Sequence, residues 1–336
     1  MSARVLGISG SPIAGGTTDR AVEAVLAASG LESELVRLWD LDLHPCRACL
    51  ACARTNVCTG FDDDWLGLAG RLVRADALVL GGWQPFNIID AATKMLMERA
   101  FSLRHSLLLL ADAVGVAVVT GTVDPAPGAD SLLAYFETEG LEPLGKVAVA
   151  GTDPCWSCGL GEVCVQGGTL PLLSGYQVFK YPHLDRLPPL ESFRITPDIL
   201  PPKLEEQPDS LAEAERLGLL IAERVEARAA QRLRALEAAL PAVSPPPPPS
   251  ATLVAALTER FAATGALRDE QLVRRLRRLA AAAERHGAAG ASGKAVVSLL
   301  AFGRSLLLAP ESQVDAAARD LLVAEARRAA RVCYAP

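Results

Sequence analysis

The first 150 residues alternate short apolar runs, rich in β-branched side chains, with segments of helical periodicity. The apolar runs span residues 4–9, 34–38, 77–81, 114–120 and 146–150. The helical patterns lie between them, at residues 18–28, 64–73, 90–110 and 129–139. Such alternation is typical of parallel strands joined by crossover helices. The pattern therefore predicts an α/β fold built around a parallel sheet.

Five strands joined by short loops predict a flavodoxin-like sheet in the order 2-1-3-4-5, with helices on both faces. Residues 151–207 are rich in glycine and proline and contain three cysteines, so we expect them to be irregular. A helical pattern follows from Ser210 to Leu240, and Ser210 and Glu213 have the spacing of a capping box. We expect the first half of this helix to pack on the sheet.

A proline-rich linker, residues 241–250, contains five consecutive prolines and is expected to be a stiff, extended spacer. Residues 251–336 follow it with the pattern of three or four amphipathic helices. The sequence thus predicts a flavodoxin-like domain over residues 1–240 and a C-terminal all-α helical domain of unknown role.

Composition excludes several classes of protein. Half of the 336 residues are hydrophobic and 21% are charged, so the chain is not wholly disordered. A net charge of −6 argues against non-specific binding of nucleic acid. No apolar stretch is long enough to span a bilayer, and the N-terminus lacks a signal-peptide pattern, so we expect a cytoplasmic protein that does not bind membranes. Eight cysteines in that compartment indicate metal or redox chemistry rather than disulfides.

A glycine-rich segment, residues 7–18, joins the first predicted strand to the first predicted helix and is called the phosphate loop below. Its glycines allow close approach of a ligand, and the helix N-terminus offers backbone N–H groups and a positive dipole end to a phosphate. The loop lacks both a GxGxxG pattern and a Walker A lysine, which favours a mononucleotide such as FMN over NAD or ATP. The candidate cofactor-binding residues here are Ser9, Ser11, Pro12, Gly16, Thr17 and Thr18.

Four cysteines lie within thirteen residues after the second predicted strand, as Cys46, Cys49, Cys52 and Cys58. This spacing allows four thiolates to surround one point, as a [4Fe–4S] cluster requires. Four thiolates also suit tetrahedral zinc, and uncoordinated thiols are the third alternative. We take the iron–sulfur cluster as the principal interpretation.

A second group, Cys155, Cys158 and Cys164, repeats part of this spacing after the fifth predicted strand. Three thiolates are enough to hold a second cluster whose fourth ligand comes from elsewhere, and zinc is the alternative. Redox-sensitive thiols without metal are the remaining interpretation. The sequence leaves these three possibilities open.

The phosphate loop and the first cysteine motif together resemble the iron–sulfur flavoprotein family, within the flavodoxin-like NAD(P)H-dependent FMN reductase superfamily. The family's phosphate loop commonly reads G-S-P-R-x-x-G-N-T, and this chain departs from it at Ile13 and Thr17. Loss of the arginine removes one charge-assisted hydrogen bond to phosphate. The resemblance covers about residues 1–150. It implies flavin-lining residues after the third and fourth strands, here Trp83, Phe86, Asn87, Thr120 and Gly121.

The resemblance implies an oxidoreductase that uses FMN and a [4Fe–4S] cluster. Its electrons would pass between a ferredoxin-like donor or NAD(P)H and a small-molecule acceptor, in a homo-oligomer. The first alternative is an electron-transfer module without its own substrate. The second is a zinc-stabilised flavodoxin-like interaction protein without FMN, which Ile13 and the altered residues 82–87 favour. The intact four-cysteine motif favours the two redox hypotheses, the oxidoreductase and the electron-transfer module.

Overall fold

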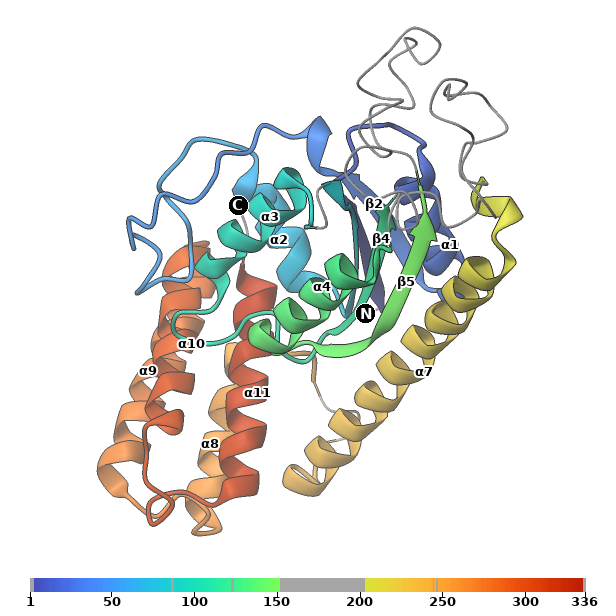
Figure 1. Ribbon diagram of the computed structural model, residues 1–336. Coiled ribbons are helices and arrows are strands. Elements are labelled where there is room, and N and C mark those ends of the chain that lie inside the picture. The colour runs from blue at the N-terminus through green and yellow to red at the C-terminus, as the bar shows by residue number, and fades with distance from the viewer. Residues whose placement is uncertain are drawn as a thin grey trace, which may run out of the picture.

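The computed structural model describes residues 3–85, 88–121, 124–151, 203–243, 245 and 247–334. In these residues one parallel sheet runs in the order β2-β1-β3-β4-β5 (Figure 1). Its strands are β1 (Arg4–Ser9), β2 (Glu32–Arg37), β3 (Ala77–Trp83), β4 (Val114–Gly121) and β5 (Glu142–Ala150). The predicted strand order and the flavodoxin-like α/β class are confirmed.

Helices cover both faces of the sheet. One face carries α1 (Thr17–Ser29) and α7 (Pro208–Ala239), and the other carries α2 (Trp65–Arg74), α3 (Ala91–Ala100) and α4 (Ala126–Glu139). The first half of α7 packs on the sheet as predicted, with Leu217 and Ile221 fully buried. Gly218 lets α7 approach α1 closely, because a Cβ at this position would lie 2.6 Å from the Val25 carbonyl oxygen.

Two predicted helix boundaries are wrong. The helix expected over residues 90–110 ends as α3 at Ala100, followed by the 3-10 turn Phe101–Leu103. The apolar residues beyond it fold into turns and are buried, because tertiary contacts outweigh the helical periodicity. The capping box at Ser210 is also wrong, since α7 already begins at Pro208 and the Ser210 hydroxyl donates to the Ala148 carbonyl at 2.9 Å.

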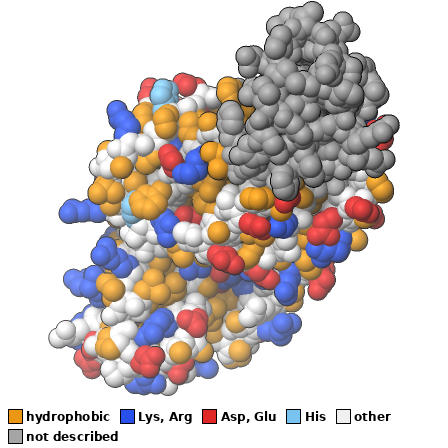
Figure 2. Space-filling view, in the orientation of Figure 1, with side chains coloured by type: hydrophobic (Ala, Val, Ile, Leu, Met, Phe, Trp, Pro, Cys, Tyr) orange, Lys and Arg blue, Asp and Glu red, His pale blue; other side chains and the backbone are white. Residues whose placement is uncertain are grey.

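The C-terminal region is all-α, as predicted. Four helices form what we call the helical unit: α8 (Ala251–Ala263), α9 (Glu270–Ala288), α10 (Ser292–Leu307) and α11 (Ala316–Cys333). In Figure 2 its Lys and Arg side chains are interspersed with acidic and apolar ones. In the described ranges, no helix is both long and apolar enough to cross a membrane.

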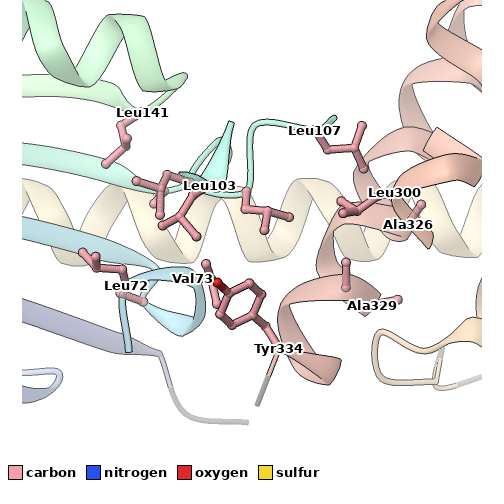
Figure 3. Close-up of a cluster of buried hydrophobic side chains, with 14 of the residues drawn as sticks. Leu72, Val73, Leu103, Leu107, Leu141, Leu300, Ala326, Ala329 and Tyr334 are labelled. Atoms are coloured by element: carbon pink, nitrogen blue, oxygen red, sulfur yellow. The ribbon is translucent and has the colours of Figure 1, made fainter. Parts of the chain in front are cut away.

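The helical unit and the sheet share one continuous hydrophobic core. Figure 3 shows Leu107, from the turn before β4, beside Leu300 of α10, and Val73 of α2 beside Tyr334. The buried guanidinium of Arg331 in α11 adds polar contacts, donating to the backbone carbonyls of Val73 and, at 2.6 Å, Ala75. The two parts of the chain are therefore joined by packing as well as by the linker.

We expect Gly303→Val to lower the free energy of unfolding by about 1–3 kcal/mol, because it overpacks this junction. A Cβ at Gly303 would lie 2.8 Å from Leu107 Cδ1, whereas a Cβ at Gly293 in the same helix meets nothing within 4 Å. Gly293→Val is therefore the matched control, with an expected change within about 0.5 kcal/mol. Urea denaturation measures both, and equal effects would contradict the close approach of α10 to this turn.

Candidate functional site

The phosphate loop is fixed to the carboxyl edge of the sheet. The backbone N–H of Gly10 donates to the Gly81 carbonyl at 2.9 Å, which ties the loop to β3. A side chain at Gly10 would overlap the Thr93 hydroxyl and the Asp90 carboxylate. Asp90 is the buried N-cap of α3 and accepts hydrogen bonds from the backbone N–H groups of Thr93 and Trp83. Only glycine fits between the loop and this cap.

The N-terminus of α1 leaves donors for an anion. Gly16 is the N-cap and supplies no side-chain hydrogen bond, and Gly15 turns the chain with a φ of +64°. Among the described residues, the backbone N–H groups of Thr17 and Thr18 and the Thr17 hydroxyl have no hydrogen-bond acceptor. Free N–H groups at the positive end of a helix, beside a hydroxyl, fit a phosphate monoester.

A buried carboxylate, Asp19, organises the phosphate loop from within. It accepts hydrogen bonds from the Ser9 hydroxyl at 2.5 Å and the Gly15 N–H at 2.9 Å. Arg37 at the end of β2 pairs with it at 2.9 Å and also donates to the Ser11 carbonyl. Arg37 therefore neutralises the negative charge that would otherwise repel a phosphate. Sequence reasoning missed this pair, although an acidic residue in the first turn of α1 was a visible signal.

Some predicted ligand hydroxyls form bonds within the protein. Ser9 is fully buried and donates to Asp19, while Thr18 hydrogen-bonds Thr120 at 2.8 Å. The Thr18–Thr120 bond joins the start of α1 to the end of β4. Pro12 is exposed on the outside of the loop. The hydroxyl best placed for a ligand is that of Thr17.

Two tryptophans lie at or just after the ends of β2 and β3, the strands on either side of β1. Trp83 is half-buried at the end of β3, and Trp39 lies 59% exposed after β2 with its indole N–H donating to the Gly10 carbonyl at 3.0 Å. Sequence reasoning missed Trp39. The predicted flavin-lining residues Phe86 and Asn87 lie outside the described residues. The structure thus places the Trp39 indole against the phosphate loop and Trp83 at the end of the neighbouring strand β3.

Gln84 fastens the loop after β3 to the loop after β4. Its side-chain amide donates to the Asp124 carbonyl and accepts from the Gly128 N–H, at 2.8 and 2.7 Å. The Gly121 carbonyl, at the end of β4, accepts a hydrogen bond from the Gly151 N–H. The structure therefore brings Trp83, Thr120 and the phosphate loop together at the switch point of the sheet.

The second component of the site is the cysteine loop, residues 41–64, which leads from β2 to α2. Its anchor is a pair of side chains, Asp63 and Arg99, each 1% exposed. The Arg99 guanidinium donates to both oxygens of Asp63, at 2.6 and 3.1 Å, and to the His44 carbonyl at 2.7 Å. It also lies over the rings of Phe61 and Trp65. Arg99 thus binds the cysteine loop near both of its ends, at His44 and at Asp63.

Asp63 is ionised in this setting. Burial alone would raise its pKa, but hydrogen bonds from Arg99 and from the backbone of His44 and Trp65 outweigh burial and lower the pKa. Asp64, the N-cap residue of α2, supplies no side-chain cap, and Asp63 serves mainly the ion pair.

The four cysteines lie on the outer part of this loop. Cys46 and Cys49 are exposed, Cys52 and Cys58 are half-buried, and the Cys52 sulfur lies 3.2 Å from the His105 ring. Burial raises the pKa of the Cys52 thiol, and the three neighbouring thiols of the motif raise it further. What fits a metal here is the donor type, since four sulfur atoms on one loop are the ligands of iron–sulfur and zinc sites.

No group of side chains in the described part of the chain has the geometry of a closed metal site. The second cysteine group, Cys155, Cys158 and Cys164, lies outside the described residues. What supports metal binding at the first group is thus the number of its cysteines and their close spacing in the sequence.

The helical unit supports the inner side of the cysteine loop. Asn56 is fully buried with a φ of +54°, and its side chain bonds the Leu107 carbonyl and the Ser106 N–H, at 2.8 and 2.9 Å. The Tyr334 hydroxyl donates to the Asn56 carbonyl at 3.2 Å. Burial raises the pKa of Tyr334, so this hydroxyl remains a donor. No sequence signal links residues separated by 278 positions.

An open groove of about 540 Å³ lies beside Cys46, between α3 and α4. Leu50 and Phe101 present exposed apolar surface there. Burial raises the pKa of Glu139, at the base of this groove, to about 7, although Arg104 at 3.3 Å favours its ionised form. The cysteine loop is therefore accessible from outside along this side.

Comparisons with known proteins agree with this geometry. Residues 3–126 match the model of the NADPH-dependent FMN reductase family, and residues 251–330 match that of the FIMAH domain. Over 121 residues the chain is 36% identical to an iron–sulfur flavoprotein of Methanocaldococcus jannaschii and 29% identical to one of Methanosarcina thermophila. Those alignments cover 35% of this chain and 62% and 63% of the relatives.

Solved structures with a similar arrangement include RosB with a bound 8-demethyl-8-formylriboflavin-5'-phosphate intermediate, at 13% identity and a TM-score of 0.44. That match covers 68% of this chain and 79% of RosB. An archaeal flavodoxin matches at 12% identity and a TM-score of 0.35, over 66% of this chain and 99% of its own.

Residues 3–126 thus match the FMN reductase family in sequence, and the sheet to which they contribute has the flavodoxin-like strand order. Over the aligned 121 residues the chain is similar to iron–sulfur flavoproteins, and it spans less than two thirds of the length of these two archaeal relatives. The family resemblance noted from the phosphate loop and the cysteine motif is confirmed.

We expect Asp63→Asn to lower the free energy of unfolding by about 3 kcal/mol, because it leaves the Arg99 cation buried without a counter-ion. Asp62→Asn is the matched control, since Asp62 is exposed, and its expected change is within about 0.5 kcal/mol. Urea denaturation followed by circular dichroism measures both variants. Equal stability of the two variants would show that the ion pair does not anchor the loop.

Proposed function

We propose that this protein is an FMN-dependent oxidoreductase that exchanges electrons through a [4Fe–4S] cluster held by Cys46, Cys49, Cys52 and Cys58. The observation that carries the proposal is the pair of sites in one domain. A phosphate-binding helix N-terminus follows β1, and a four-thiol loop follows the neighbouring strand β2. Similarity to two archaeal iron–sulfur flavoproteins supports the combination.

The residues of the chain bind and orient the two groups in this proposal. The N–H groups of Thr17 and Thr18 and the Thr17 hydroxyl hold the phosphate, while the Asp19–Arg37 pair fixes the loop. Trp83, with Thr120 nearby on β4, borders the ring. FMN interconverts one- and two-electron steps, and an iron–sulfur cluster carries single electrons. The protein therefore contributes distance, orientation and exclusion of water.

The electron donor in this proposal is a ferredoxin-like protein or NAD(P)H, and the acceptor is a small molecule. Exposure of Cys46 and Cys49 beside the open groove supports exchange with a partner protein. A homo-oligomer would bring the cysteine loop of one subunit to the flavin of another. A second cluster or zinc at Cys155, Cys158 and Cys164 belongs to the same proposal.

Cys49→Ser should remove the iron and sulfide while leaving FMN bound, because it deletes one thiolate of the cluster without touching the phosphate loop. The control is Cys333→Ser, a half-buried thiol of α11 outside the motif, which should keep all three. The measurement is anaerobic purification with iron, sulfide, zinc and flavin quantified per chain. Wild-type protein with zinc and neither iron nor flavin would instead favour the structural zinc reading.

Thr17→Val should weaken FMN binding about tenfold, because it deletes the hydroxyl free to donate to the phosphate. Thr264→Val is the control, since that hydroxyl donates to the Arg260 carbonyl at the end of α8, and its FMN affinity should match wild type. Quenching of flavin fluorescence during titration measures the affinity. An unchanged affinity in Thr17→Val would place the phosphate elsewhere.

A further inference from the structure

A second cavity, of about 610 Å³, lies at the amino-terminal edge of the sheet, opposite the phosphate loop. Arg4 begins β1, Asp76 directly precedes β3, and Asp112 lies just before β4. The other walls come from α7, from α11 and from linker prolines 247–249. The cavity is therefore enclosed by parts of the chain that are far apart in sequence.

The charged lining of this cavity is predominantly basic. Two aspartates, Asp76 and Asp112, stand against six arginines: Arg4, Arg74, Arg228, Arg232, Arg328 and Arg331. Around this cavity, two arginines often pair with the same carboxylate. Glu142 pairs with both Arg224 and Arg228, and Glu325 with both Arg232 and Arg328. Arg4 also pairs with Glu32 and Arg328 with Asp112, so the carboxylates reduce the positive charge here but remain fewer than the arginines.

Arg228 also carries a donor without a partner. Its Nη2 donates to the Glu142 carboxylate at 2.8 Å, which fixes the guanidinium. Its Nη1 is buried and has no hydrogen-bond partner in the described part of the chain. This Nη1 is enclosed by protein atoms, whereas the rest of the Arg228 side chain, 30% exposed, lines the cavity.

The remaining wall is apolar and is formed by Ala3, Val225, Ala229, Val332 and the linker prolines. A volume of this size, with an apolar wall and a few fixed polar groups, is typical of small-molecule sites. Arginine binds phosphate oxygens in pairs through its planar fork of N–H groups. These features together select a ligand with an anionic phosphate end and an uncharged organic part.

We propose that this cavity binds a small phosphorylated molecule of at least two negative charges, independently of the flavin site. Arg228, Arg4 and Arg232 supply positive charge around the phosphate. Because its walls come from the sheet, α7, the linker and α11, the ligand would stabilise the junction between the sheet domain and the helical unit.

The test is isothermal titration calorimetry of the full chain with sodium pyrophosphate at constant ionic strength. Wild type should show saturable binding, and Arg228→Gln should weaken it about tenfold, because one of the arginine charges that line the cavity is lost. Arg224→Gln is the matched control. It removes the same charge one turn away on α7, from the same Glu142 partner, but Arg224 does not line the cavity. Its affinity should stay within about twofold of wild type.

Two further variants complete the design. Arg4→Gln lies on the exposed rim and should weaken binding severalfold, which preserves the test if Arg228→Gln fails to fold. Thr17→Val should leave pyrophosphate affinity unchanged, because the phosphate loop lies at the other edge of the sheet. Absence of saturable binding in wild type, or equal losses in Arg224→Gln and Arg228→Gln, would overturn the proposal. A loss confined to Thr17→Val would assign the anion to the phosphate loop and also overturn it.

Discussion

Burial of the α2 and α3 side of the sheet domain by the helical unit is the constraint on which the rest of this structure depends. The apolar turn before β4 contains Leu107, which packs on α10. Because that turn is fixed, Asn56 finds its two backbone partners there, and the inner part of the cysteine loop follows. The same packing brings α11 to the amino-terminal edge of the sheet, where it completes the wall of the basic cavity.

Two buried ion pairs fix the conformations of the phosphate loop and the cysteine loop. Asp19 with Arg37 and Asp63 with Arg99 each join an acid at the start of a helix to an arginine from another element. Desolvating such charges costs free energy, so their contribution to stability is small compared with that of the hydrophobic core. Their directional hydrogen bonds instead allow one conformation of each loop. The phosphate loop and the cysteine loop thus use the same device at neighbouring strands.

The parts of this structure that depend on local pattern were predictable, and those that depend on distant contacts were not. Buried parallel strands and the glycine-rich turn leave strong signals, so the strand order and the phosphate loop follow from the sequence. The helix predicted through residue 110 failed, because burial beneath α10 outweighs helical periodicity. The roles of Trp39 and Tyr334 could not be predicted from the sequence. Each side chain donates a hydrogen bond to a backbone carbonyl that is distant in sequence and comes near only in the folded protein.

The hydrogen bond from Tyr334 to Asn56 has a consequence for the order of events during synthesis. Domains form as the ribosome releases them, N-terminal parts first, and the cysteine loop emerges long before residue 334. The loop must therefore wait, with its four thiols already outside the ribosome, until α11 arrives to complete its support. The cysteine loop therefore reaches its final conformation late in folding, although it lies near the beginning of the sequence.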